Sequence, residues 1–147
     1  MKSLAISLAI VLVSLATGHA TVAAQTPASA PSAVYHFDDA SVQALRGLRA
    51  ARNQLDVVGD TQITLVAHAD GVGMFLNGAR DAKSGVEFAP LIADLRSRGV
   101  EIYVCELTLA LVGLDRDSFI LEADFTPSGV GKITELQQVN GFAYIKP

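Results

Sequence analysis

Residues 88–114 read FAPLIADLRSRGVEIYVCELTLALVGL, and this stretch decides the fold. Apolar residues three and four positions apart predict an amphipathic helix over residues 88–95. Gly99 ends that helix, because glycine readily adopts the left-handed conformation that follows a helix. Residues 101–104 then predict a buried strand, and helical spacing resumes over residues 107–114. The stretch is therefore a helix, a strand and a second helix in direct succession.

The same alternation continues on both sides of this stretch. Short apolar runs predict strands, and apolar residues at helical spacing predict helices. The predicted strands cover residues 34–37, 62–67, 101–104, 121–125 and 142–145, and the predicted helices cover residues 41–55, 72–76, 88–95, 107–114 and 130–139. Apolar strands that alternate with helices are typical of a parallel sheet covered on both faces. We therefore predict an α/β fold, a three-layer α/β/α sandwich with a mostly parallel five-stranded sheet.

Three of the predicted helices have an apolar stripe that we expect to face the core. The stripes consist of Val42, Leu45, Leu48 and Leu55 in the first helix, Leu107, Ala110, Leu111 and Leu114 in the fourth, and Val130, Ile133, Leu136 and Val139 in the last. We expect Asp38 and Asp39 to start the first helix, and Gly141 to end the last one.

The first 24 residues have the composition of a secretory signal peptide. A basic start is followed by about 13 apolar residues and then by small ones, whereas a membrane span needs about 20 apolar residues. We predict cleavage after Ala24, with Ala20 as the second choice, and a periplasmic or secreted protein without a membrane span in the mature chain. Residues 25–33 (QTPASAPSA) predict a flexible lead-in, and residues 34–147 a single domain.

Composition excludes some classes of partner and of covalent structure. The chain has a formal net charge of −4 and no run of Lys or Arg, so we expect no nucleic acid partner. It contains one cysteine, Cys105, so no disulfide can form within the chain. The core must stabilise the fold without such a crosslink.

Cys105 is the candidate catalytic residue. It follows a predicted strand and precedes a predicted helix, and sites in parallel sheets gather where strands end. The N–H groups of a helix start favour the reactive thiolate, whereas Glu106 beside it disfavours that charge. A free cysteine is also common as a small buried apolar residue, so the spacing leaves both roles open. His36, His68 and Asp70 are expected at the same sheet edge as neighbours of the site.

A metal or cofactor site has little support in the sequence. His36, His68 and Cys105 would make a three-ligand set, but no short spacing such as C-x-x-C or H-E-x-x-H accompanies them. The glycine patterns also fail, since Leu76 replaces the last glycine of G-x-G-x-x-G and Ile133 replaces the Ser or Thr after Gly-Lys. We therefore predict no metal and no cofactor.

Several segments in order along the predicted domain resemble the DsrE/DsrF-like family. These segments are the strand that ends in His68, residues 71–74 (GVGM), residues 104–109 (VCELTL), residues 127–130 (PSGV) and residues 141–147 (GFAYIKP). The resemblance implies a small α/β/α protein with a five-stranded, mainly parallel sheet that assembles into trimers or hexamers. It also implies that the strand-end cysteine, here Cys105, accepts sulfur as a persulfide.

The resemblance and the predicted export signal together predict a periplasmic sulfur carrier, sulfurtransferase-like at most, that exchanges sulfur with a thiol-bearing donor or acceptor protein. The predicted export signal differs from the family pattern, because sulfur relays of this family are typically cytoplasmic. The alternative is a non-catalytic module that binds a small molecule or assembles into oligomers and that keeps Cys105 buried.

Overall fold

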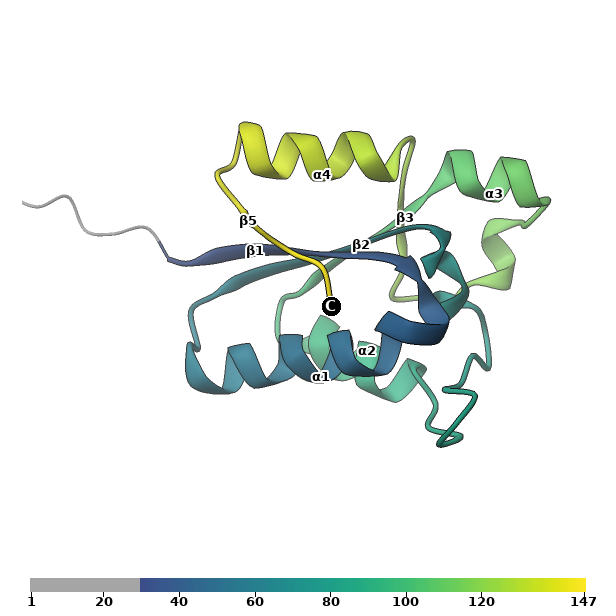
Figure 1. Cartoon of the computed structure of the whole chain (residues 1–147), viewed down its shortest axis with the longest axis horizontal. Coiled ribbons are helices and arrows are strands. Elements are labelled where there is room, and N and C mark those ends of the chain that lie inside the picture. The colour runs from purple at the N-terminus through teal and green to yellow at the C-terminus, as the bar shows by residue number, and fades with distance from the viewer. Residues whose placement is uncertain (1–29) are drawn as a thin grey trace, which may run out of the picture.

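A computed structural model describes residues 30–147 of the chain, and Figure 1 shows its arrangement. Strands and helices alternate throughout, as the spacing predicts. In chain order the elements are β1 (Ser32–Asp39), α1 (Ala40–Val57), β2 (Gln62–Asp70), the 3-10 helix η1 (Gly71–Phe75), α2 (Ala89–Ser97), β3 (Glu101–Cys105), α3 (Glu106–Val112), the 3-10 helix η2 (Arg116–Ser118), β4 (Asp124–Thr126), α4 (Gly129–Gln138) and β5 (Ala143–Ile145). The predicted signal peptide and most of the predicted lead-in lie outside the described residues.

The five strands form one sheet in the order β4-β3-β2-β1-β5. Every pair of neighbouring strands is parallel, so the prediction of a mostly parallel five-stranded sheet is confirmed. All strands therefore end at one edge, where β3 finishes at Cys105. β5 lies beside β1 although the two strands are at opposite ends of the described chain, and this placement matters for the site.

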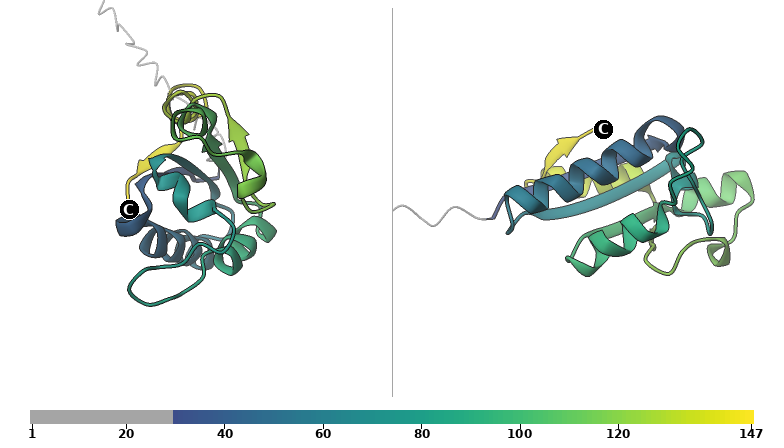
Figure 2. Two further views of the ribbon diagram at one scale, coloured as in Figure 1. Left: turned by 90° about the vertical axis from the view of Figure 1, so that its right-hand side faces the viewer. Right: turned by 90° about the horizontal axis from the view of Figure 1, so that it is seen from below.

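Helices cover both faces of the sheet, with α1 and α2 on one side and α3 and α4 on the other (Figures 1 and 2). Alternate residues of a strand point to opposite faces, so each strand supplies both layers. The α1/α2 face carries the main core, in which Phe37, Leu65 and Ile102 are fully buried. The smaller core under α4 consists of Val34, Val66, Ile133 and Leu136.

Helix α1 packs through smaller residues than the sequence predicts. Its buried side includes Ala44, Gly47 and Ala51 besides Leu48 and Leu55, whereas Val42 is 55 % exposed. The prediction that Val42 faces the core was therefore wrong. The cause is the close approach of the helix to the sheet, since a Cβ on Gly47 would lie 2.4 Å from the ring of Phe37. Small residues at the contact allow that approach.

The α3/α4 face leaves more apolar side chains uncovered. Leu107 and Leu111 are 65 % and 86 % exposed, and Val130 and Val139 are also exposed. The predicted stripe of the last helix is therefore half right, because Ile133 and Leu136 are buried while Val130 and Val139 are not. The predicted stripe of the fourth helix was wrong, since α3 buries Thr108 and Leu109 instead. α3 extends beyond the end of the sheet (Figure 1), and of its leucines Leu109 is buried in the main core whereas Leu107 and Leu111 are exposed.

Element boundaries differ from the predictions by a few residues. β1 begins at Ser32, two residues inside the predicted lead-in, because Ser32 and Ala33 pair with β2. The fourth strand is shorter than predicted, and Leu121 is fully exposed before it. Gly99 and Gly141 have the predicted positive φ angles. Within residues 30–147 we find no helix long and apolar enough to cross a membrane.

Candidate functional site

Cys105 occupies the predicted position at the carboxyl end of β3. It is the last residue of the strand and the N-cap of α3. The residue is 5 % exposed, so it is buried in the single chain but retains a small opening to solvent. The face it shares with Val66 and His68 is the one covered by α4, since Tyr103, two residues earlier, pairs with Val66.

Hydrogen-bond donors surround the sulfur of Cys105. Burial by itself would raise the pKa of the thiol, because it removes water from the thiolate. The N–H groups of Gly129, Thr108 and Leu107 and the hydroxyl of Thr108 stabilise the thiolate and outweigh this effect, so the pKa of Cys105 lies below its usual value. The N–H of Leu107 also donates to the carbonyl of Pro127. The donors come from the first turns of two helices, α3 and α4. The site therefore favours the thiolate.

Gly129 brings the start of α4 against the site. A Cβ at this position would lie 3.1 Å from the Cβ of Cys105 and 3.1 Å from the Cβ of His68. Real side chains rarely approach so closely, so the absence of a side chain permits the N–H of residue 129 to reach the sulfur. The hydroxyl of Ser128 accepts from the N–H of Gly131 and caps α4.

Thr108 links the sulfur to the end of β2. Its hydroxyl accepts a hydrogen bond of 3.0 Å from the N–H of Ala69 while it donates to Cys105. Ala69 has a φ of 47°, in the left-handed region that residues with a side chain seldom adopt. This contact therefore holds a strained turn next to His68.

The negative charge of Glu106 is paired in the fold. The sequence places this carboxylate beside Cys105, where it disfavours a thiolate. Arg116 forms an ion pair with Glu106 and also lies over the ring of Phe125, 4.9 Å from its centroid. The cation comes from η2, ten residues further along the chain, which the spacing did not reveal.

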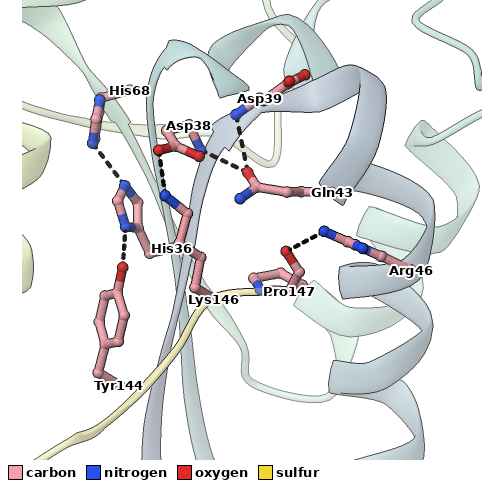
Figure 3. A network of polar contacts seen from close by, with 9 residues as sticks. All are labelled: His36, Asp38, Asp39, Gln43, Arg46, His68, Tyr144, Lys146 and Pro147. Carbon is pink, nitrogen blue, oxygen red and sulfur yellow. Dashed lines mark hydrogen bonds and ion pairs between the residues drawn. The ribbon is translucent and has the colours of Figure 1, made fainter.

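His36 and His68 meet at the predicted edge and form a hydrogen-bonded row with Tyr144 (Figure 3). The Nε2 atoms of the two histidines lie 2.7 Å apart, so one of them carries the proton between them. On the other side of the ring, Nδ1 of His36 lies 2.6 Å from the hydroxyl oxygen of Tyr144. The three side chains come from β5, β1 and β2, which are adjacent in the sheet.

Charged groups beside this row set its protonation. Burial lowers the pKa of His36 most, and the neighbouring His68 and Lys146 lower it further while Asp38 opposes them. Lys146 forms an ion pair of 2.5 Å with Asp38 and lowers the pKa of that carboxyl. Asp70, predicted as a neighbour of the site, is exposed at the end of β2 and lies outside this row.

A three-ligand metal set does not assemble in the part of the chain that the structure describes. No group of three or more His, Cys, Asp or Glu side chains there is arranged to hold a metal ion. Instead, the two histidines direct nitrogen atoms at each other.

Sequence reasoning missed three members of the site, Tyr144, Thr108 and Gly129. Tyr144 and His36 are 108 positions apart in the chain. Gly129 lies in the segment PSGV that supports the family resemblance, but its role depends on how closely α4 approaches β3. A threonine one turn into the helix after a cysteine is a weak signal that could have drawn attention to Thr108.

The fold and the site define a small α/β/α protein with a strand-end cysteine held by two helix starts. The profile of the DsrE/DsrF-like family matches residues 18–147, so the chain belongs to this family. Among solved structures it is similar to MTH1491 of Methanobacterium thermoautotrophicum, described as a protein of unknown function. The two are 30 % identical over 80 % of this chain and 99 % of that one, with a TM-score of 0.68. None of the curated proteins matches the chain.

Proposed function

We propose that this protein is an exported sulfur carrier that holds sulfane sulfur as a persulfide on Cys105. One observation carries the proposal: the first turns of α3 and α4 direct hydrogen-bond donors at the Cys105 sulfur and lower its pKa. Membership of a family of sulfur-relay type supports the same chemistry. The protein would act as a sulfurtransferase-like carrier rather than as an enzyme that turns over alone.

Sulfur transfer to Cys105 needs only a thiolate and a sulfur donor. The Cys105 thiolate attacks the terminal sulfur of a donor persulfide, R–S–SH, and a new S–S bond forms. The donor S–S bond breaks, and its electron pair leaves with the donor thiolate, RS⁻. In the reverse sense, an acceptor thiolate attacks the outer sulfur of Cys105–S–SH and Cys105 leaves as a thiolate. Donors that stabilise this thiolate assist both steps.

The limited exposure of Cys105 restricts which donors can reach it. A slender species such as a polysulfide anion fits a 5 % exposed residue better than a bulky reagent does. We therefore expect polysulfide to load the sulfur directly. A protein donor would have to present its sulfur on an extended side chain.

Intact-mass measurement after incubation with polysulfide tests the proposal. We expect one added sulfur atom on the wild-type protein, removed by a reducing thiol, and none on Cys105→Ser. Since Cys105 is the only cysteine in the chain, the variant is a complete control. No mass gain on the wild type, or the same gain on both proteins, would exclude the carrier function.

A binding or assembly module with an inert cysteine is the alternative, and the burial of Cys105 favours it. A hollow of about 430 Å³ on the α1 side, lined by Gly73, Leu76, Arg80 and Phe88 among others, offers such a module a ligand site. Alkylation distinguishes the two functions. A carrier thiol reacts with iodoacetamide in the folded protein, whereas an inert one reacts only after denaturation.

The assembly state and the sulfur partner are further parts of the proposal. Exposed Leu107 and Leu111 on α3 lie next to Cys105, and α4 exposes Val130. Contiguous apolar surface of this kind favours contact with another protein. We expect a trimer or hexamer, measured by light scattering, and expect Leu111→Glu to shift the mass towards the monomer. A thiol-bearing partner would need an approach to Cys105 that the oligomer leaves open.

Export is proposed from the composition of residues 1–24 alone. Expression of the full chain in a bacterial host, followed by fractionation and N-terminal sequencing, tests it. We expect a periplasmic product that begins at Gln25. A full-length product in the cytoplasm would contradict the proposal, and the polysulfide experiment would still stand.

A further inference from the structure

Four side chains on one face of the sheet form a row that ends at the cysteine. β5, β1, β2 and β3 are successive strands, and they contribute Tyr144, His36, His68 and Cys105 respectively. Two short hydrogen bonds join the first three (Figure 3). His68 and Cys105 lie against the same glycine, Gly129, with both Cβ atoms equally close to the position that a side chain would occupy.

We propose that the His36–His68 pair accepts the proton of the Cys105 thiol, so that the thiolate forms together with a protonated histidine pair. The inference rests on the proposed function for its use, because sulfur transfer requires this thiolate. His68 is the member on the strand beside Cys105, across Gly129 from it, and His36 and Tyr144 are positioning residues that act through it. Histidine is the side chain suited to this exchange near neutral pH.

The hydrogen bonds of the row accommodate one extra proton. The neutral pair carries two N–H protons, and one of them lies between the facing Nε2 atoms, 2.7 Å apart. When Nδ1 of His68 accepts the thiol proton, each histidine has an N–H at Nδ1 and the pair shares the proton between the Nε2 atoms. The Nδ1–H of His36 then donates to Tyr144, whose hydroxyl both donates and accepts. The S–H bond breaks, an N–H bond forms, and no other bond changes.

The surroundings of His36 disfavour its protonated form. Burial and Lys146 disfavour a proton taken up from solvent, and they lower the pKa of His36, whereas Asp38 raises it. Lys146 itself is bound to Asp38. In the proposal, a negative charge on the sulfur adds to that of Asp38 in favouring the protonated pair. A thiolate on the neighbouring strand would stabilise a proton on the pair.

Other charged groups near the row are paired among themselves. On α4, Lys132 lies 3.3 Å from Glu135 and 4.7 Å from the ring centroid of Tyr103. Glu106, next to the cysteine, is bound to Arg116. Because these charges are neutralised in place, the histidine pair is the group that responds to ionisation of the thiol.

The pH dependence of Cys105 alkylation by iodoacetamide tests the inference on the intact protein. His68→Gln keeps the size of the side chain and removes the proton acceptor. We expect an apparent thiol pKa about one unit higher, hence an alkylation rate about tenfold lower at pH 7. At about pH 10, where every thiol is ionised, we expect an unchanged rate. His36→Gln should shift the profile in the same direction, and Tyr144→Phe should do so by about two- to threefold.

Tyr103→Phe is the matched control, since Tyr103 lies on the same face and outside the row, and we expect its profile to equal that of the wild type. Unchanged profiles for both histidine variants would overturn the inference. A rate that falls equally at every pH would also overturn it, because such a loss indicates a structural defect. Should the variants fail to fold, histidine titration by NMR in Cys105→Ser replaces them, and loss of the thiolate should lower the pKa of the pair.

The two proposals fail separately. A wild-type protein that shows the histidine-dependent profile but gains no sulfur from polysulfide would retain the proton acceptor and lose the carrier function. A protein that gains sulfur equally well with and without the histidines, and with identical pH profiles, would retain the carrier function and lose the proton acceptor.

Discussion

The two faces of the sheet are built from the same strands, but one carries the main apolar core and the other carries the candidate site. On the α1/α2 face, alternate residues of β1, β2 and β3 place Phe37, Leu65 and Ile102 in one continuous apolar core. On the α3/α4 face, the intervening residues begin as a small core at Val34 and Val66 and end in the polar row at the strand ends. One face thus supplies most of the burial, and the other tolerates polar and strained groups that the first face stabilises.

The largest expected effect is a difference in the free energy of unfolding lost when a core residue is removed from each face. Phe37→Ala removes a fully buried ring from the main core and should lower the free energy of unfolding by about 3–5 kcal/mol. Leu136→Ala in the small core should cost about 2 kcal/mol, because the half-open α4 layer can collapse around the gap. Urea unfolding measures both values. Equal losses would show that the two cores contribute alike and would break the comparison.

Two helix glycines give the next contrast. In Gly47→Ala the new Cβ would meet the buried ring of Phe37 at 2.4 Å, so overpacking should outweigh the better helix propensity and destabilise the fold by about 1–3 kcal/mol. Gly129→Ala meets the Cβ atoms of His68 and Cys105 at 3.1 Å and should displace the start of α4 slightly. We expect the first variant to keep the alkylation profile of Cys105 and the second to change it. A changed profile in Gly47→Ala and an unchanged one in Gly129→Ala would contradict the assignment of the site to the α4 side of the sheet.

Thr108→Val tests the hydrogen bonds to the sulfur without touching the main core. Loss of the hydroxyl removes one donor to the thiolate, so the pKa of Cys105 should rise and its alkylation at pH 7 should slow by about tenfold. The variant also leaves the N–H of Ala69 without its acceptor. Thr134→Val is the control, because that hydroxyl donates to the carbonyl of Val130 within α4, away from the sulfur. A thiol pKa equal to that of the wild type would contradict the role of Thr108.

The smallest effect concerns the ion pair that flanks the row. Lys146 lowers the pKa of Asp38 in the folded protein, so the pair stabilises the fold above the ordinary carboxyl pKa and this contribution disappears as pH falls through the lowered value, below about pH 4. Asp38→Asn should therefore reduce stability slightly at pH 7 and by less at pH 3. Thermal unfolding at the two pH values measures the difference. An equal loss at both values would show that the carboxylate charge is not responsible.

Most of the fold could be predicted from the sequence, because the strongest signals for strands and helices are local. Apolar runs and helical spacing predicted all five strands and the helices between them, and Gly99 and Gly141 marked two helix ends. The faces of the helices were predicted less well, because apolar spacing shows which residues are able to pack and not which neighbour they meet. Val42, Leu107 and Leu111 are exposed for that reason.

The candidate site was predicted in part. Cys105, His36 and His68 were expected at one edge, since parallel strands end together, and the structure brings the two histidines into contact and places His68 with Cys105 around Gly129. Asp70 was expected beside them and is exposed instead. The N–H groups of α3 were expected to favour the thiolate, whereas the contribution of Gly129 was not predictable, since it depends on how closely α4 approaches β3.

The amino-acid sequence by itself determined the alternation of strands and helices, the end of β3 at Cys105 and the two-residue period that separates the faces, because these features depend on neighbours within a few residues. The tertiary structure alone decided that β5 lies beside β1, which brings Tyr144 to His36 across 108 positions. It also decided that Gly129 and Thr108 reach the sulfur. Strand order and the approach of the helices depend on packing contacts throughout the chain, so they cannot be predicted from patterns of neighbouring residues.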